Sequence, residues 1–115
     1  MTSIYKIVRR REWREAEARG VYLGSADDLR DGFIHLSTAG QVAGTLARHF
    51  TGEPDLLLVT VEAEAFGDEL RWEPSRGGQL FPHLYGPLPV PLARSVAECP
   101  VAADGQHVLP PELAR

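Results

Sequence analysis

The chain has 115 residues, of which 43% are hydrophobic and 24% charged, a size and composition typical of one globular domain. Its single cysteine excludes an intramolecular disulfide framework and a cysteine-rich zinc fold. A formal net charge of −4 opposes broad electrostatic binding to duplex nucleic acid, and no apolar run approaches the ~18 residues of a membrane-spanning helix. We therefore expect one cytoplasmic domain over residues 1–115, with neither duplex nucleic acid nor a membrane as partner and with a tail that is mobile from about residue 108.

The first expected elements are a strand over residues 4–8 and a helix over residues 10–19. Apolar residues dominate the strand, whereas Glu, Ala and Arg favour the helix and Gly20 suits its end. Residues 1–19 hold six basic and three acidic side chains. The arginines from Arg9 to Arg11 form either a phosphate-contacting edge or the solvated start of the helix, where they pair with glutamates one turn on.

A short helical turn and a longer helix flank the next expected strand, which covers residues 33–37. Ser25 is a suitable cap for the short turn. The longer helix, over residues 38–50, begins with Thr38 and Gln41 at the spacing of a capping box. Apolar residues then recur at helical spacing along one face, which predicts that this face packs against the core.

The second half of the chain is predicted to consist of strands with short links. Residues 56–61 are a near-continuous apolar run, which predicts a central strand buried on both faces, and further strands are expected over residues 70–73, 80–85 and 93–99. The prolines at 82, 87, 89 and 91 indicate a sheet edge or rim, because proline cannot donate to a ladder. The order of elements predicts an α+β fold, with a mixed, mainly antiparallel sheet on which two helices pack.

The first candidate site segment is the predicted strand over residues 33–37. Side chains alternate in a strand, so His35 and Ser37 share one face and line a surface or cleft if the aliphatic residues between them face the core. Thr38 follows at the start of a helix, whose free N–H groups favour an anion. The alternative is a structural His35, with Ser37 and Thr38 serving only as caps.

The second candidate segment follows the expected strand over residues 70–73. Glu73 supplies a carboxylate, Arg76 offers a fork for phosphate or carboxylate, and Gly77 and Gly78 allow a ligand to approach the backbone closely. A hairpin turn uses paired glycines too, so the alternative is a plain turn with an exposed Arg76.

The third candidate segment places Phe81, His83 and Tyr85 on one face of an extended stretch. Such a row is able to stack on a planar ring and to hydrogen-bond with it, as nucleotide sites require. The alternative is a rim strand that packs its aromatic residues onto the core. The histidines have no His-x-x-x-His spacing, so we expect no metal site.

Four motifs occur together in this chain: GFIHLS at residues 32–37, RWE at 71–73, a Gly-Gly pair at 77–78 and FPHLYG at 81–86. This combination resembles the domain-of-unknown-function 952 family. The resemblance implies a fold similar to the ADP-ribosyltransferase-like, NAD-binding fold. It also implies a small nucleotide or anion as partner, with NAD or an ADP-ribose-like nucleotide as substrate and no further cofactor.

The three segments together give the candidate residues. The predicted catalytic residues are His35, Glu73 and His83, and the predicted ligand-binding residues are Ser37, Thr38, Arg76, Gly77, Gly78, Phe81 and Tyr85. The resemblance implies roles for three of them. Among these, His35 would hold a ribose or the nicotinamide amide, Tyr85 would stack, and Glu73 would stabilise a sugar cation.

Three functions therefore stay open. The first is an enzyme that transfers or hydrolyses the nucleotide, with ADP-ribosyltransferase-like or phosphotransferase-like activity. In transferases of this fold the glutamate comes late in the chain, whereas Glu73 precedes the segment of His83 and Tyr85, so a non-catalytic binding module is the second. The third is a homodimeric interaction domain with the aromatic and histidine row as its seam; the oligomeric state is monomer or homodimer.

Overall fold

The structure, a computed structural model, describes residues 1–113 and has the α+β architecture expected from the sequence. Its strands and α-helices are, in chain order, β1 (Ser3–Arg9), α1 (Arg10–Arg19), β2 (Val21–Tyr22), α2 (Ala26–Asp31), β3 (Ile34–His35), α3 (Val42–His49), β4 (Leu56–Glu62), β5 (Leu70–Pro74), β6 (Leu80–Leu84), β7 (Leu88–Pro89) and β8 (Ser95–Cys99). Short 3-10 helices cover Ala63–Glu69, Arg76–Gly78, Val90–Leu92 and Pro111–Leu113.

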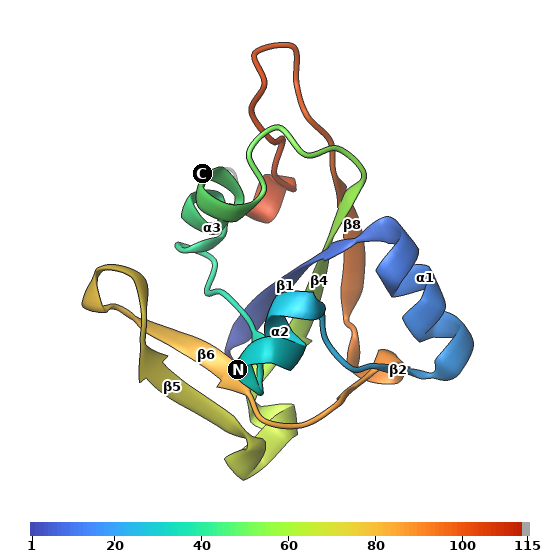
Figure 1. The fold of residues 1–115 in the computed structure, drawn as a ribbon, viewed down its shortest axis with the longest axis vertical. Helices are drawn as coiled ribbons and strands as arrows, with labels where there is room; N and C mark the ends of the chain where they lie inside the picture. The colour runs from blue at the N-terminus through green and yellow to red at the C-terminus, as the bar shows by residue number, and fades with distance from the viewer. Residues whose placement is uncertain (114–115) are drawn as a thin grey trace.

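The first sheet has β4 in the middle, with β1 and β8 as antiparallel neighbours, so the predicted central strand is confirmed. Alternation along β1 divides the core between the two faces of this sheet. Ile4 and Val8 belong to the cluster that includes α1, whereas Tyr5 and Ile7 belong to the cluster that includes α3. The two helices accordingly lie on opposite sides of the sheet (Figure 1).

The second sheet carries the candidate site. Its order is β3-β6-β5, again antiparallel, and its register sets His35 opposite His83. It meets the first sheet at a bridge between Tyr5 and Ser37, where each N–H donates to the other carbonyl at 2.8 and 2.9 Å. A third pair, β2 with β7, completes the described strand pairing.

The prediction of one mixed sheet with two packed helices was wrong in detail. The described strands form three separate sheets whose pairs are all antiparallel, and three α-helices accompany them. β3 ends after His35 because Pro82, which accepts from Leu36 N–H, has no N–H to donate back, and the chain at Ser37 then bonds to Tyr5 of β1.

The long helix is shorter than predicted at both ends. It starts at Val42 and ends at His49, and no side chain caps it at Gln41. Half of the expected capping box forms, because Thr38 N–H donates to the Gln41 side chain at 3.0 Å while the Thr38 hydroxyl makes no cap. Thr38 therefore belongs to the turn that leads into α3.

Pro82 contradicts the prediction that the prolines mark an edge or rim. It lies in β6, the middle strand of the second sheet. A residue in an antiparallel ladder directs its N–H and C=O toward the same neighbour. The Pro82 carbonyl accepts from Leu36 N–H at 3.0 Å, and β3 ends at His35, so the missing N–H falls where that ladder stops.

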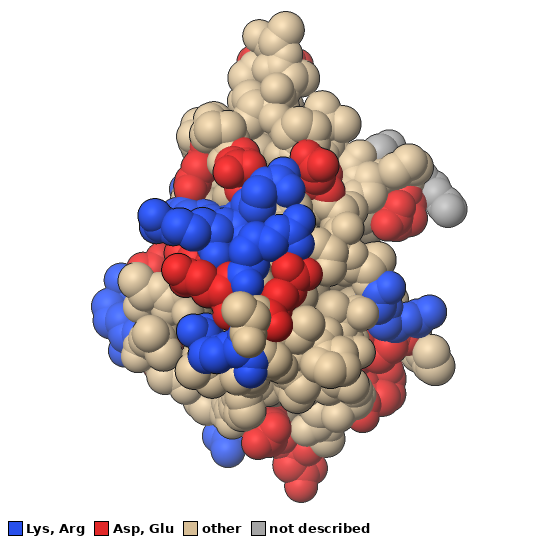
Figure 2. Space-filling model, turned by 90° about the vertical axis from the view of Figure 1, so that its right-hand side faces the viewer, with Lys and Arg blue, Asp and Glu red and all other residues tan. Residues whose placement is uncertain are grey.

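The arginines at the start of α1 are paired. Arg9 contacts Glu53 at 2.5 Å, and Arg10 contacts Asp55 at 2.6 Å and Glu98 at 3.0 Å. Figure 2 shows the result on the α1 side of the molecule, where basic side chains are bordered by acidic ones. These arginines serve as surface ion pairs, reaching across to other elements as well as along the helix.

The chain end packs on the second cluster. Leu109 and Leu113 lie against the core residues around α3. Residues 114 and 115 lie outside the described part, and the mobility of the tail from about residue 108 stays a prediction. Within the described part, no helix has the length and apolar character needed to cross a membrane.

Candidate functional site

A cavity of about 290 Å³ lies where the two three-stranded sheets meet α2 and α3. His35 of β3 and His83 of β6 contribute to its lining, with Arg76 from the turn between β5 and β6. Thr45 of α3 and Asp31 of α2 line other parts of it. Segments far apart in the sequence thus bring two imidazoles and a guanidinium to one concave surface.

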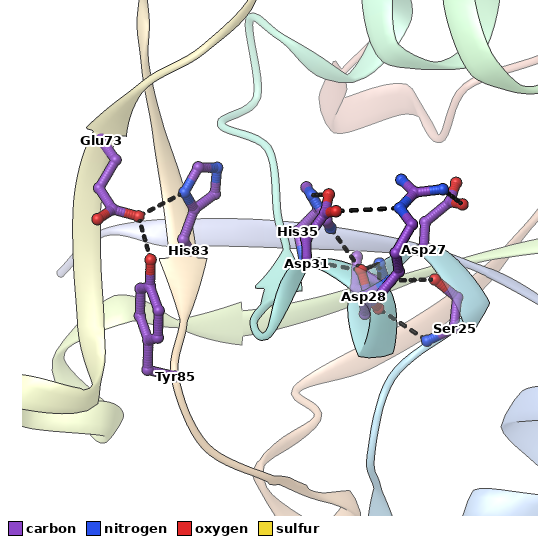
Figure 3. Close-up of polar contacts among 10 residues, drawn as sticks. Ser25, Asp27, Asp28, Asp31, His35, Glu73, His83 and Tyr85 are labelled. Atoms are coloured by element: carbon purple, nitrogen blue, oxygen red, sulfur yellow. Dashed lines mark hydrogen bonds and ion pairs between the residues drawn. The ribbon is translucent and has the colours of Figure 1, made fainter.

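His83 is held by the neighbouring strand. Its Nδ1 lies 2.7 Å from Glu73 Oε1, and the Tyr85 hydroxyl donates to the same oxygen at 2.8 Å, as Figure 3 shows. Hydrogen bonds from His83 and Tyr85 lower the pKa of Glu73, so it stays a carboxylate at neutral pH. An ionised carboxylate only accepts, so Nδ1 carries the proton and Nε2 is the nitrogen left for a ligand.

Phe33 fixes the plane of this imidazole. Its ring stacks on His83 with centroids 4.1 Å apart and an interplanar angle of 24°, and it also contacts His35 at 4.6 Å and Tyr85 at 5.1 Å. The guanidinium of Arg71 covers the Tyr85 ring at 4.6 Å. Rings packed in this way restrict rotation, so His83 presents Nε2 in one direction.

His35 belongs to a second, separate polar cluster centred on buried Asp28 (Figure 3). Asp28 Oδ1 lies 2.6 Å from His35 Nδ1 and 3.1 Å from Lys6 Nζ, and Oδ2 accepts from Ser25 N–H at 2.8 Å. Burial raises the pKa of Asp28, but the hydrogen bond from His35 and the charge of Lys6 outweigh it and hold this pKa well below its ordinary range. Asp28 is therefore an anion that ties together β1, the start of α2 and β3.

The other nitrogen of His35 is also engaged. Nε2 lies 3.0 Å from Asp31 Oδ2, at the end of α2. Since both partners are carboxylates, both bonds form together only with a doubly protonated ring. While Asp31 stays in place, His35 has no ring nitrogen free for a ligand.

Arg76 supplies the cationic part of the cavity. Its guanidinium lies over the Phe81 ring at 4.9 Å and donates to Thr45 Oγ1 at 3.4 Å, which in turn bonds with Ser37 Oγ at 3.0 Å. A Cβ at Gly44 would stand 3.0 Å from Arg76 Nη2, so the absence of a side chain there leaves room for the guanidinium. Among the described residues, no carboxylate forms an ion pair with Arg76.

Comparison with known proteins gives the family. Residues 7–96 match the family described as "Protein of unknown function (DUF952)". The chain belongs to the DUF952 family. It is 50% identical to protein CC0527 from Caulobacter crescentus, whose crystal structure matches with a TM-score of 0.93 over 99% of this chain and 100% of that one. A solution NMR structure of CC0527 matches with 51% identity and a TM-score of 0.87, covering 99% and 98% of the two chains. No curated protein matches the chain.

The residues predicted for the site divide into three groups in this DUF952 member. His35, Ser37, Arg76, Phe81 and His83 line the cavity. Glu73 and Tyr85 do not line the cavity, but Glu73 bonds to His83 and to the Tyr85 hydroxyl. Thr38, Gly77 and Gly78 do not line the cavity either. The two glycines have φ of 67° and 78°, which agrees with the turn alternative. Within residues 1–113, no three His, Cys, Asp or Glu side chains are grouped to hold a metal ion.

Three charged residues around His35 were not predicted for the site. Lys6, Asp28 and Asp31 line the cavity and were not candidates. Two signals were present: Lys6 interrupts a strand of otherwise apolar residues, and Asp28 stands three positions after Ser25, the spacing of a capping box that the structure contains. Neither pattern predicts the ion pair between Lys6 Nζ and Asp28 Oδ2, which lie 2.9 Å apart, because this contact depends on tertiary packing.

Proposed function

We propose that this cavity binds NAD or another ADP-ribose-like nucleotide, in keeping with the resemblance to the ADP-ribosyltransferase-like fold. The observation that carries the proposal is that Arg76, with no carboxylate partner among the described residues, and His83, with one uncommitted nitrogen, line the same cavity. A guanidinium binds phosphate through paired N–H groups, and a fixed imidazole is suited to proton transfer.

The size of the cavity sets which part of the nucleotide enters. About 290 Å³ lies at the lower end of the roughly 300–1,000 Å³ of small-molecule pockets. A ribose with one neighbouring phosphate fits that range better than a whole dinucleotide. In this proposal Arg76 binds the phosphate, and the rest of the molecule extends past the cavity mouth.

His83 is the acid–base group of the proposal. Its Nε2 accepts a proton from water as the water oxygen bonds to the anomeric carbon of the nicotinamide ribose. The bond from that carbon to the nicotinamide nitrogen breaks, its electron pair stays with the nitrogen, and nicotinamide leaves neutral. Glu73 stabilises the imidazolium that results and acts as a positioning residue.

Binding is tested by titrating isotope-labelled protein with ADP-ribose and NAD and following backbone amide shifts. We expect saturable shifts around Arg76, His35 and His83. Arg76→Gln should weaken binding about tenfold or more, because a charge-assisted hydrogen bond is lost. Arg48→Gln is the matched control, since Arg48 is an exposed arginine of α3 that does not line the cavity. No shift with millimolar nucleotide would rule the proposal out.

Catalysis is tested separately by following nicotinamide release from NAD. We expect release by the wild type and its loss in His83→Gln, with nucleotide affinity largely kept. Glu73→Gln should slow release and change its pH profile, which a merely structural role would not do. Saturable binding with no release in any form of the protein would assign a non-catalytic binding module instead.

A further inference from the structure

Asp31 occupies a position that helix electrostatics disfavours. It is the last residue of α2, where the helix dipole presents its negative end. Lysine or arginine stabilises such a position, whereas a carboxylate destabilises it. A residue placed against its local preference is held by contacts elsewhere, and Asp31 has two: His35 Nε2 at 3.0 Å and Arg30 Nε at 3.1 Å.

The two carboxylates on His35 differ in their access to solvent. The Asp28 side chain is 1% exposed and also bonds to Lys6 and Ser25, so its contact with His35 is part of the protein interior. The side chains of Asp31 and His35 are 36% and 37% exposed. Ion pairs with this exposure are screened by water and contribute little, so the Asp31 contact is the one that a ligand is able to replace.

We propose that Asp31 is an autoinhibitory group, whose carboxylate occupies the place on His35 Nε2 that a phosphate oxygen of the bound nucleotide takes. This inference rests on the proposed function for the identity of the ligand. The exchange conserves the bonding of the imidazole, because one anionic oxygen replaces another while Asp28 keeps Nδ1. Arg76 and His35 then provide two donors for the phosphate groups within one cavity.

The structure also provides a second place for the displaced carboxylate. Arg30 Nε already contacts Asp31 Oδ1, so the Asp31 side chain keeps one cationic partner after it leaves His35. When a ligand displaces Asp31, His35 exchanges a solvent-screened contact for a contact with the ligand, and the Asp31 carboxylate is still paired with Arg30. The cost to the ligand is the small free energy of that exposed pair, which corresponds to about a two- to five-fold reduction in affinity.

The test compares Asp31→Ala with Asp27→Ala, using ADP-ribose as the probe and calorimetry as the measurement. Asp27 is the matched control: it lies on the same helix, lines the same cavity and bonds to Arg30 at 3.0 Å, but makes no contact with His35. Both variants remove one negative charge and leave Arg30 one carboxylate. We expect Asp31→Ala to bind ADP-ribose about two- to five-fold more tightly than Asp27→Ala. Equal affinities would overturn the inference and leave the proposed function standing.

A second measurement distinguishes failure of the proposed function from failure of the autoinhibitory role of Asp31. If ADP-ribose and NAD bind neither the wild type nor Asp31→Ala, the proposed function is wrong. Inorganic phosphate then becomes the probe, read from the amide shifts of His35 and Arg76. Tighter phosphate binding by Asp31→Ala than by Asp27→Ala sustains the autoinhibitory contact for a different anionic ligand, and equal or absent binding overturns it.

Discussion

The two histidines of the cavity sit 5.6 Å apart, ring centre to ring centre, yet their surroundings differ in kind. His83 is buried and bonds to one carboxylate through one nitrogen, which leaves the other nitrogen for the cavity. His35 is more exposed and has a carboxylate on each nitrogen. Exposure alone would favour His35 as the reactive group, whereas the hydrogen bonds favour His83.

The difference extends to what each cluster holds together. The cluster of His35 includes the buried ion pair of Lys6 and Asp28, and it joins β1, α2 and β3. The cluster of His83 lies within two neighbouring strands and includes no second basic group bonded to Glu73. We conclude that the first cluster stabilises the fold, while the second orients His83, the acid–base group of the proposed function.

The largest effect should come from Asp28→Asn. Removing the charge of Asp28 leaves Lys6 buried without its counter-ion, so the free energy of unfolding should fall by about 3–5 kcal/mol, measured by urea denaturation. Glu73→Gln should lose much less, because Glu73 is partly exposed and pairs with no buried lysine. Similar losses in the two variants would contradict the division between a structural and a chemical cluster.

Lowering the pH should reduce the free energy of unfolding through Asp28 as well. The pKa of Asp28 is depressed in the folded protein, despite burial, by the hydrogen bond from His35 and the charge of Lys6, while the unfolded chain has an ordinary pKa near 3.8. As the pH falls, the unfolded state takes up the proton first. The stability from Asp28 is thus complete above about pH 5 and is lost as pH falls through the unfolded value toward the folded one. Urea midpoints measured down this range should fall steeply in the wild type and less in Asp28→Asn.

A smaller effect should be visible at Tyr85. The hydrogen bond from the Tyr85 hydroxyl to Glu73 raises the pKa of Tyr85 above its ordinary value of 10.0. Glu73→Gln removes the carboxylate that disfavours the phenolate, so this pKa should fall toward the ordinary value, as followed by phenolate absorbance. Glu62→Gln is the control, because Glu62 of β4 bonds to Ser3 and Arg94 and not to Tyr85, and it should leave the Tyr85 titration unchanged. An unshifted Tyr85 in Glu73→Gln would mean that the bond does not persist in solution.

The smallest effect concerns Arg76 and the glycine of α3 beside it. Gly44→Ala should stabilise α3 by up to about 1 kcal/mol, since alanine favours a helix interior over glycine. The new methyl group would stand 3.0 Å from Arg76 Nη2, so the guanidinium must shift and affinity for ADP-ribose should drop. Thermal unfolding and calorimetry measure the two effects. A gain in stability with unchanged affinity would show that ADP-ribose binding does not depend on the position of the Arg76 guanidinium beside Gly44.

Local patterns predicted those parts of the fold that local interactions determine. The apolar run became the central strand β4, the first helix ended at Gly20 with φ of 89°, and Ser25 capped α2 as expected. The separation into three sheets was not predictable in this way. It depends on strand register: Leu36 meets Pro82, which has no N–H to extend the ladder, and the two lie 46 residues apart in the chain.

For the site, alternation along the strand predicted Phe81, His83 and Tyr85 on one face, and of these Phe81 and His83 line the cavity. It did not predict which nitrogen of each histidine is engaged, because Glu73 lies on a neighbouring strand and Asp31 on a helix. Periodicity predicts which face of a strand a side chain occupies, whereas its hydrogen-bond partners on other elements depend on strand register and helix packing. Glu73, predicted as a catalytic residue, and Tyr85, predicted as a ligand-binding residue, hydrogen-bond to each other, and Glu73 also bonds to His83.

The seam between the two three-stranded sheets has a consequence for motion. Among the described residues, the backbone hydrogen bonds that join these sheets are the reciprocal pair between Tyr5 and Ser37. The cavity opens beside that pair, so spreading the sheets to admit a bulky molecule breaks these two backbone hydrogen bonds and leaves both ladders intact. Deuterium uptake at these two amides should consequently run ahead of uptake in β4, and a molecule that wedges itself into the gap should slow it.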